Sequence, residues 1–259
     1  MPKSAGYVSP QYLKMIAEIV RTFKVSTYDL MNIKKGDTVL DIGCGPGVDT
    51  IHLASYVGSD GKVFGVDIDE EMIELANKEA DDKNVADIVQ HKSGSLEKLP
   101  FENNSINACR AERLFQVIPS SVDRTPLFSE LYRVMQPQGR VVIVDTDWAT
   151  ASVDFSDVAT ERTLMSFLAQ KMRPDGFAGR SLKRFLIASG FNIVKLDAVT
   201  LVHRGLDETA FGEWLTSTAL ENNIITTTQA KNWLDELTEK SRNGNFYASV
   251  GSVIVVAEK

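Results

Sequence analysis

Val39-Leu40-Asp41-Ile42-Gly43-Cys44-Gly45-Pro46-Gly47 is a glycine-rich segment that indicates the fold class of the chain. An apolar, strand-like run (residues 38–42) ends in a turn with three glycines, and a helix-like run (residues 49–57) follows it. Glycines let the backbone bend tightly and approach a ligand closely, and the N-terminus of the following helix offers unpaired N–H donors. The stretch therefore predicts a strand, a ligand-binding turn and a helix.

The sequence around this turn alternates between strand-like and helix-like runs. Further strands are predicted at residues 62–68, 86–92, 105–111 and 140–146, and further helices at 69–82 and 122–135. This alternation is typical of βαβ units in a largely parallel sheet, and the apolar run at 141–144 fits a sheet that is covered on both faces. We expect an α/β fold built on a doubly wound, mostly parallel sheet.

Helical additions are predicted before and after this core. Helices at 12–23 and 26–33 form an N-terminal helical cap, residues 1–35, and residues 36–150 form the Rossmann-like core. Residues 151–259 form the C-terminal part of the same domain, with helices at 155–172, 179–191, 207–221 and 226–242 and closing strands at 191–203 and 246–258. We expect these helical insertions to form a lid that determines substrate specificity.

Composition excludes several classes of protein. The 28 Lys and Arg against 35 Asp and Glu give a net charge of −7, whereas nucleic-acid binders usually show a basic surface. Two cysteines cannot build a disulfide framework or a Cys-rich zinc site, and no metal is predicted. The first residues lack the apolar core of a signal peptide, and no apolar run approaches the roughly 18 residues of a membrane span. We expect a cytoplasmic protein.

An acid that follows the second predicted strand indicates the kind of ligand. Asp67 comes about twenty residues after the glycine turn, the position at which an acid accepts hydrogen bonds from ribose hydroxyls. A dinucleotide site normally reads G-x-G-x-x-G, whereas this loop reads G-x-G-x-G, and Asp41 suits a cationic amino or sulfonium group better than a pyrophosphate. The two features predict a nucleoside-containing cofactor across the carboxyl ends of the first two strands.

These residues resemble the class I S-adenosylmethionine-dependent methyltransferases, well over residues 36–150 and loosely toward the C-terminus. The resemblance implies a seven-stranded Rossmann-like sheet with an antiparallel C-terminal strand, and S-adenosyl-L-homocysteine as the product. It also implies a set of cofactor-binding residues: Asp41, Gly43, Cys44, Gly45, Gly47, Asp67, Ile68, Met72, Ser95, Leu96 and Arg110. The family often has an acid where Ser95 stands, so here a hydroxyl takes that role or the role is absent.

The residues after the fourth strand resemble small-molecule methyltransferases of the ubiquinone/menaquinone-biosynthesis type. Glu112 lies where the crevice opens and is the candidate general base, although it also fits a structural acid paired with a neighbouring arginine. Arg113, Gln116 and Trp148 are the candidate substrate-binding residues. His203, at the end of a late strand, is a less favoured base.

The leading hypothesis is a methyltransferase that transfers a methyl group to a small organic acceptor by in-line displacement. One alternative is an inactive cofactor-binding partner or sensor protein. Another is a protein or nucleic-acid methyltransferase, which is disfavoured because no two prolines are adjacent and the N/D-P-P-aromatic motif is therefore absent. The sequence does not specify the acceptor, the atom that is methylated or the oligomeric state.

Overall fold

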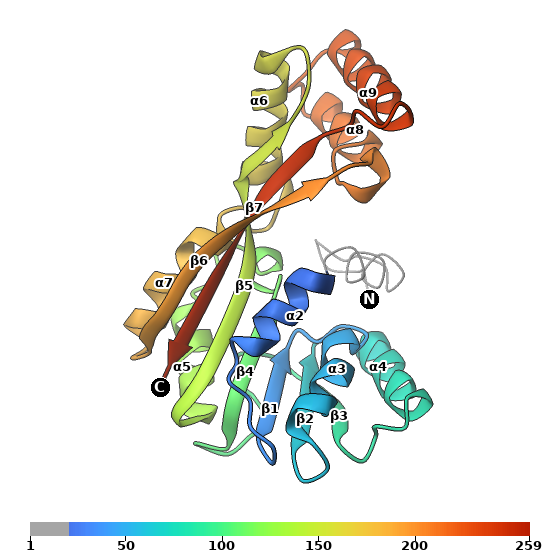
Figure 1. Cartoon of the computed structure of the whole chain (residues 1–259). Coiled ribbons are helices and arrows are strands. Elements are labelled where there is room, and N and C mark those ends of the chain that lie inside the picture. Colours follow the sequence, from blue (N-terminus) through green and yellow to red (C-terminus); the bar gives the residue numbers. More distant parts are fainter. Residues whose placement is uncertain (1–20) are drawn as a thin grey trace.

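The computed structural model describes residues 21–259 and contains a seven-stranded sheet in the order β3-β2-β1-β4-β5-β7-β6 (Figure 1). Five neighbouring strands are parallel: β1 (Thr38–Ile42), β2 (Lys62–Asp67), β3 (Val89–Ser93), β4 (Ile106–Glu112) and β5 (Met135–Val153). Strand β7 (Ala248–Glu258) runs antiparallel to both β5 and β6 (Asn192–His203). The predicted doubly wound sheet with an antiparallel C-terminal strand is confirmed.

Helices cover both faces of the sheet, as its apolar strands require. On one face lie α5 (Thr125–Val134) and α7 (Ala178–Ala188), which bury Phe128 and Leu182 against the strands. On the other face lie α2 (Arg21–Asp29) and α3 (Val48–Val57), which bury Tyr28 and Leu53. Helix α4 (Glu70–Asp82) contacts β2 and β3.

A second hydrophobic core lies beyond the sheet, where β5, β6 and β7 continue past their neighbours (Figure 1). It is built by α6 (Val158–Phe167), a π-helical turn (Leu168–Met172), a short 3-10 turn (Leu206–Glu208), α8 (Glu213–Glu221) and α9 (Thr227–Arg242). We call residues 154–172 and 204–247 the helical lobe. Trp233 of α9 is fully buried there, packs on Phe155 and donates from Nε1 to the carbonyl of Phe211 at 2.7 Å.

The elements predicted within residues 36–259 are present, but several boundaries were wrong, and the helix predicted at 26–33 ends at Asp29. The break between helices at 12–23 and 26–33 is wrong, because α2 continues through it and the Thr27 hydroxyl donates to the Lys24 carbonyl at 2.6 Å inside the helix. Residues 12–20 of that prediction lie outside the described residues. Asn32, with φ of 54°, lies in the left-handed region beyond the end of α2.

Strand boundaries differ for local reasons. Strand β3 begins at Val89 instead of residue 86, because the carbonyl of Val85 accepts the N–H groups of Ile88 and Val89 in a turn. Strand β5 continues to Val153, because its second half packs against the helical lobe, and residue 150 therefore lies inside a strand. In the region that the structure describes, we find no helix with both the length and the apolar character of a membrane span.

Candidate active site

The carboxyl ends of the parallel strands meet at one edge of the sheet, and the predicted site residues gather there. The glycine turn follows β1, Asp67 ends β2, Ser95 follows β3, and Glu112 ends β4. The chain topology thus brings together residues that are distant in sequence, such as Asp41 and Glu112, which are 71 positions apart.

The glycine turn adopts backbone conformations that other residues rarely take. Gly43, Gly45 and Gly47 have φ values of 73°, 52° and 78°. A Cβ on Gly47 would lie 2.9 Å from the Cβ of Ala76 and 2.9 Å from Nε2 of His91, so a larger residue does not fit. Gly47 also begins α3 without a side-chain cap, which leaves N–H donors at this helix end for a ligand.

Asp67 joins the second strand to this turn. Its Oδ2 accepts the N–H of Gly45 at 2.8 Å, and its Oδ1 accepts the N–H of Asp69 at 3.0 Å. Each oxygen has a further lone pair, so the half-buried carboxylate can still accept hydroxyl hydrogens from a ligand. The next side chain, Ile68, is 77% exposed and offers an apolar surface beside that carboxylate, while Met72 is buried on α4.

Ser95 and Leu96 lie on the far side of Asp67. The carbonyl of Asp67 accepts the N–H of Gly94 at 2.9 Å, which fixes the segment after β3 against β2. Ser95 is half-buried, and its hydroxyl accepts the N–H of Glu97 at 3.2 Å. Leu96 is buried in the core with Val66.

A buried ion network lies beneath the turn and consists of Lys24, Asp41, Asp49, Arg110 and Glu112. Arg110 is 1% exposed, its Nη1 lies 2.5 Å from Asp49 Oδ2, and its Nη2 pairs with Glu112. Lys24 Nζ lies 2.8 Å from both Asp49 Oδ2 and Glu112 Oε1. Sequence analysis missed Lys24 and Asp49, which lie on α2 and α3 and meet β4 only in the folded chain.

The ion network holds three carboxylates and only two cations. Burial raises the pKa of Asp41 to about 7, although Arg110 opposes this effect, and Asp49 adds to it. Asp41 Oδ2 lies 4.0 Å from Arg110 Nη1 and has no hydrogen-bond partner among residues 21–259. Burial also opposes ionisation of Asp49, but Arg110 and Lys24 hold its pKa below the ordinary value. The site is therefore suited to one further positive charge near Asp41.

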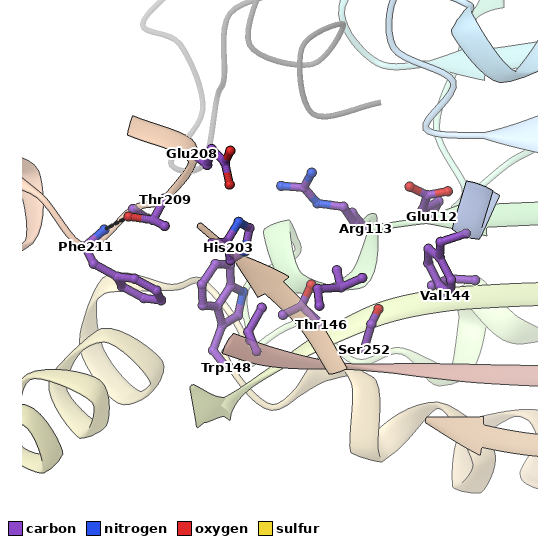
Figure 2. Close-up of a pocket in the computed structure, with 14 residues that line it drawn as sticks. Glu112, Arg113, Val144, Thr146, Trp148, His203, Glu208, Thr209, Phe211 and Ser252 are labelled. Atoms are coloured by element: carbon purple, nitrogen blue, oxygen red, sulfur yellow. Dashed lines mark hydrogen bonds between the residues drawn. The ribbon is translucent and has the colours of Figure 1, made fainter. Parts of the chain in front are cut away.

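A cavity opens beside Glu112, between the edge of the sheet and the helical lobe (Figure 2). Its empty space, the open mouth included, measures about 630 Å³. Its apolar lining comprises Phe23, Val144, Trp148, Leu201, Ala210, Phe211 and Val250, and its polar lining comprises Glu112, Arg113, Thr146, His203, Glu208, Thr209 and Ser252. We call it the lobe cavity.

Two of the three predicted substrate residues, Arg113 and Trp148, line the lobe cavity, and the third, Gln116, does not. The Trp148 indole is nearly buried, and its Nε1–H donates to Gln116 Oε1 at 2.6 Å. Gln116 thus fixes the orientation of the Trp148 indole without lining the cavity itself. Most of the lining from β6, β7 and the helical lobe was missed, and the one signal for it was the position of His203 at a strand end.

Comparison with known proteins gives the family. The model for the methyltransferase domain family matches residues 33–188, more than half of the chain. The chain belongs to this methyltransferase family. The assignment confirms the enzyme class and the methyl donor, S-adenosylmethionine, that the sequence predicted.

Curated relatives of this methyltransferase differ in how much they share with it. An uncharacterised 37.1 kDa protein in transposon TN4556 of Streptomyces fradiae is 29% identical over 252 residues, which cover 95% of this chain and 70% of that protein. The demethylmenaquinone methyltransferase of Lactobacillus johnsonii is 34% identical over 120 residues (46% of this chain and 48% of the enzyme). The arsenite methyltransferase of Halobacterium salinarum is 30% identical over 198 residues (72% and 46%). The chain spans about half the length of these two enzymes.

Solved structures show the same fold at low sequence identity. A putative methyltransferase from Bacillus halodurans superposes with a TM-score of 0.62 at 18% identity, covering 91% of this chain and 98% of that one. Geranyl diphosphate C-methyltransferase from Streptomyces coelicolor, solved with Mg²⁺, geranyl diphosphate and S-adenosyl-L-homocysteine, superposes with a TM-score of 0.59 at 19% identity, covering 97% and 84%. These likenesses confirm the Rossmann-like methyltransferase fold.

Proposed function

We propose that this methyltransferase transfers the methyl group of S-adenosylmethionine to a small organic acceptor bound in the lobe cavity. One observation carries the proposal: Glu112 belongs both to the ion network under the glycine turn and to the lining of the cavity. A cofactor at the turn and an acceptor in the cavity would therefore meet at this residue. The relatives named for demethylmenaquinone and arsenite, and the structure with geranyl diphosphate, all involve small molecules, which supports this choice.

The residues that would contact the cofactor lie at the ends of β1, β2 and β3 and on helix α4. Asp67 would hold the ribose hydroxyls with its free lone pairs, and the exposed Ile68 would cover the adenine ring together with Met72. Ser95 and the backbone N–H of Leu96 would face the adenine edge. Gly43, Cys44, Gly45 and Gly47 would lie against the methionine portion, where only glycine permits the close approach at the positive φ values of the turn.

The charge of the ion network fits the methyl donor. When bound, S-adenosylmethionine supplies an electrophilic methyl group on a positively charged sulfur. Asp41, which has a buried oxygen without a described partner, would face the added positive charge. Arg110 forms ion pairs with Asp49 and Glu112 and holds both carboxylates in place. A direct contact between Arg110 and the cofactor stays a prediction.

Glu112 is the residue that we propose as the general base. Its carboxylate lines the lobe cavity, and one oxygen pairs with Lys24 while the other pairs with Arg110. These two cations fix its position at the end of β4. A positioned base contributes roughly 10²–10⁴ in rate when the nucleophile must lose a proton.

The three parts of the chain would have different roles, and the two cysteines bear on the cellular compartment. We propose that residues 36–150 bind the cofactor, that residues 1–35 cap this core, and that the lobe within 151–259 selects the acceptor. Both cysteines, Cys44 and Cys109, are buried free thiols, which suits a reducing compartment such as the cytoplasm. The enzyme would act there in small-molecule metabolism.

A transfer assay with methyl-labelled S-adenosylmethionine tests the proposal. Phenols, quinols, amines and carboxylates are offered as acceptors, with bulk protein and nucleic acid in parallel reactions. We expect label in a small-molecule product, and Glu112→Gln should lower turnover by roughly 100-fold or more while the affinity for S-adenosylhomocysteine stays unchanged. Label only in protein or nucleic acid, or cofactor binding without transfer to any acceptor, would contradict the proposal.

A further inference from the structure

We propose that the lobe cavity recognises its acceptor through a carboxylate held between Arg113 and His203, with an apolar body lying against the aromatic wall. The inference rests on the proposed function, because it names the acceptor class for the same cavity. It depends on two polar side chains that line the cavity and for which residues 21–259 supply no partner, and on the aromatic side chains of Phe23, Trp148 and Phe211 in the same lining.

Arg113 supplies a positive charge that forms no ion pair within residues 21–259, although buried Asp145 interacts with it electrostatically. Its guanidinium lines the cavity, and none of the described residues forms an ion pair or hydrogen bond with it. Its backbone is held in the left-handed region at φ of 57°, with its N–H donating to the Val144 carbonyl at 2.8 Å. A non-glycine residue in this region is uncommon and persists where its surroundings hold it. The turn after β4 thus aims a charged side chain into the cavity.

His203 faces the same space from the end of β6. Figure 2 shows the Arg113 guanidinium pointing toward the His203 imidazole across the cavity. The Nδ1 atom of His203 is buried and has no hydrogen-bond partner in the described part of the chain. Burial lowers the pKa of His203; Arg113 acts in the same direction and Glu208 opposes it. This shift favours the neutral imidazole, which carries one N–H donor.

These two donors face each other and have no partner in the part of the chain that the structure describes, so an oxygen ligand between them would satisfy both. A carboxylate supplies two acceptor oxygens, one for the guanidinium fork and one for the imidazole N–H. Phe23, Trp148 and Phe211 provide aromatic surface for an apolar body attached to that carboxylate.

The other charged side chains in the cavity, Glu112 and Glu208, also affect how tightly an anion binds. Both carboxylate oxygens of Glu112 are paired with cations, Lys24 and Arg110, which reduces its repulsion of an anion. Glu208 lies at the rim, where its Oε2 accepts the N–H of Arg204 at 3.0 Å (Figure 2). Its negative charge weakens the binding of an anion and strengthens that of a cation, so Glu208→Gln is the matched control for Arg113→Gln.

Three probes of similar shape test the inference by calorimetry in the presence of saturating S-adenosylhomocysteine. Hydrocinnamate is the anion, hydrocinnamide the neutral analogue and phenylpropylamine the cation. The wild-type protein should bind hydrocinnamate about tenfold or more tightly than the amide, a difference of about 1.4 kcal/mol. Arg113→Gln should remove this preference, and Glu208→Gln should increase it. Equal binding of anion and amide, a preference for the amine, no binding of any probe, or a preference that survives Arg113→Gln would overturn the inference.

Titration of His203 by NMR gives a second readout that does not require turnover. Hydrocinnamate should raise the pKa of His203, and Arg113→Gln should raise it in the free protein, with His203→Gln identifying the signal. A pKa that responds to neither change would overturn the inference. Binding of S-adenosylhomocysteine and label transfer to neutral acceptors alone would leave the proposed function intact and refute this inference. A carboxylate preference without label transfer to any acceptor would refute the proposed function instead.

Discussion

Replacing Arg110 by methionine tests whether the buried ion network stabilises the fold. The substitution keeps most of the side-chain volume but removes one of the two cations, so Asp49 and Glu112 remain buried with Lys24 as their only described cationic partner. Removing one partner of a buried ion pair typically costs about 3–5 kcal/mol. Because the whole stability of a domain is about 5–15 kcal/mol, we expect Arg110→Met to remove a large part of it.

Urea unfolding at pH 7, followed by circular dichroism, measures this loss. The control is Lys231→Met on α9. Lys231 forms an ion pair with Asp235, and their side chains are 73% and 63% exposed, so this pair should contribute less than about 1 kcal/mol. Adding Asp49→Asn to Arg110→Met should recover part of the stability, because it removes a carboxylate that lost its partner. A loss below about 1 kcal/mol for Arg110→Met, or no recovery in the double variant, would mean that the buried ion network does not stabilise the fold.

Three further predictions concern the residues around the glycine turn. Burial lowers the pKa of His91 from 6.5 to about 4, so only the unfolded chain takes up this proton between those values. As the pH falls from about 6.5 to about 4, the free energy of unfolding should therefore decrease by up to about 1.4 kcal/mol per pH unit. Urea titrations of His91→Gln should lack this decrease. Gly47→Ala should lower stability more than Gly244→Ala in urea unfolding, since both have positive φ but a Gly47 Cβ meets two atoms at 2.9 Å while none lies within 4 Å of a Gly244 Cβ. The affinity for S-adenosylmethionine, measured by calorimetry, should rise as pH rises through about 7, because a bound cation favours ionised Asp41, and Asp41→Asn should flatten this profile.

The sequence was sufficient to bring the candidate cofactor-binding residues to one edge of the sheet, because that arrangement follows from the strand topology. The carboxyl ends of parallel strands share one edge, so residues such as Asp41 and Asp67 could be placed together from strand order alone. The helix predictions were less accurate at α2. Neither Lys24 nor Val25 is a helix-breaking residue, but the apolar pattern alone did not show that one helix continues through them.

The lobe cavity could not be predicted in the same way. Its residues come from α2, from four strands and from a 3-10 turn in the helical lobe, and their proximity depends on how far β5, β6 and β7 extend beyond the sheet. Residue spacing does not encode that extension. The pairing of Trp148 with Gln116 and of Arg110 with Asp49 likewise depends on side-chain packing between segments distant in sequence.

Calorimetric binding of S-adenosylhomocysteine to the wild-type protein and to Asp67→Ala shows whether the cofactor lies across the ends of β1 and β2. Glu71→Ala, which removes an exposed acid from the first turn of α4, is the control. We expect the wild type and Glu71→Ala to bind equally and Asp67→Ala to lose about 1–3 kcal/mol, the value of its hydrogen bonds. Absence of binding to the wild type, or an affinity that Asp67→Ala leaves unchanged, would contradict the account.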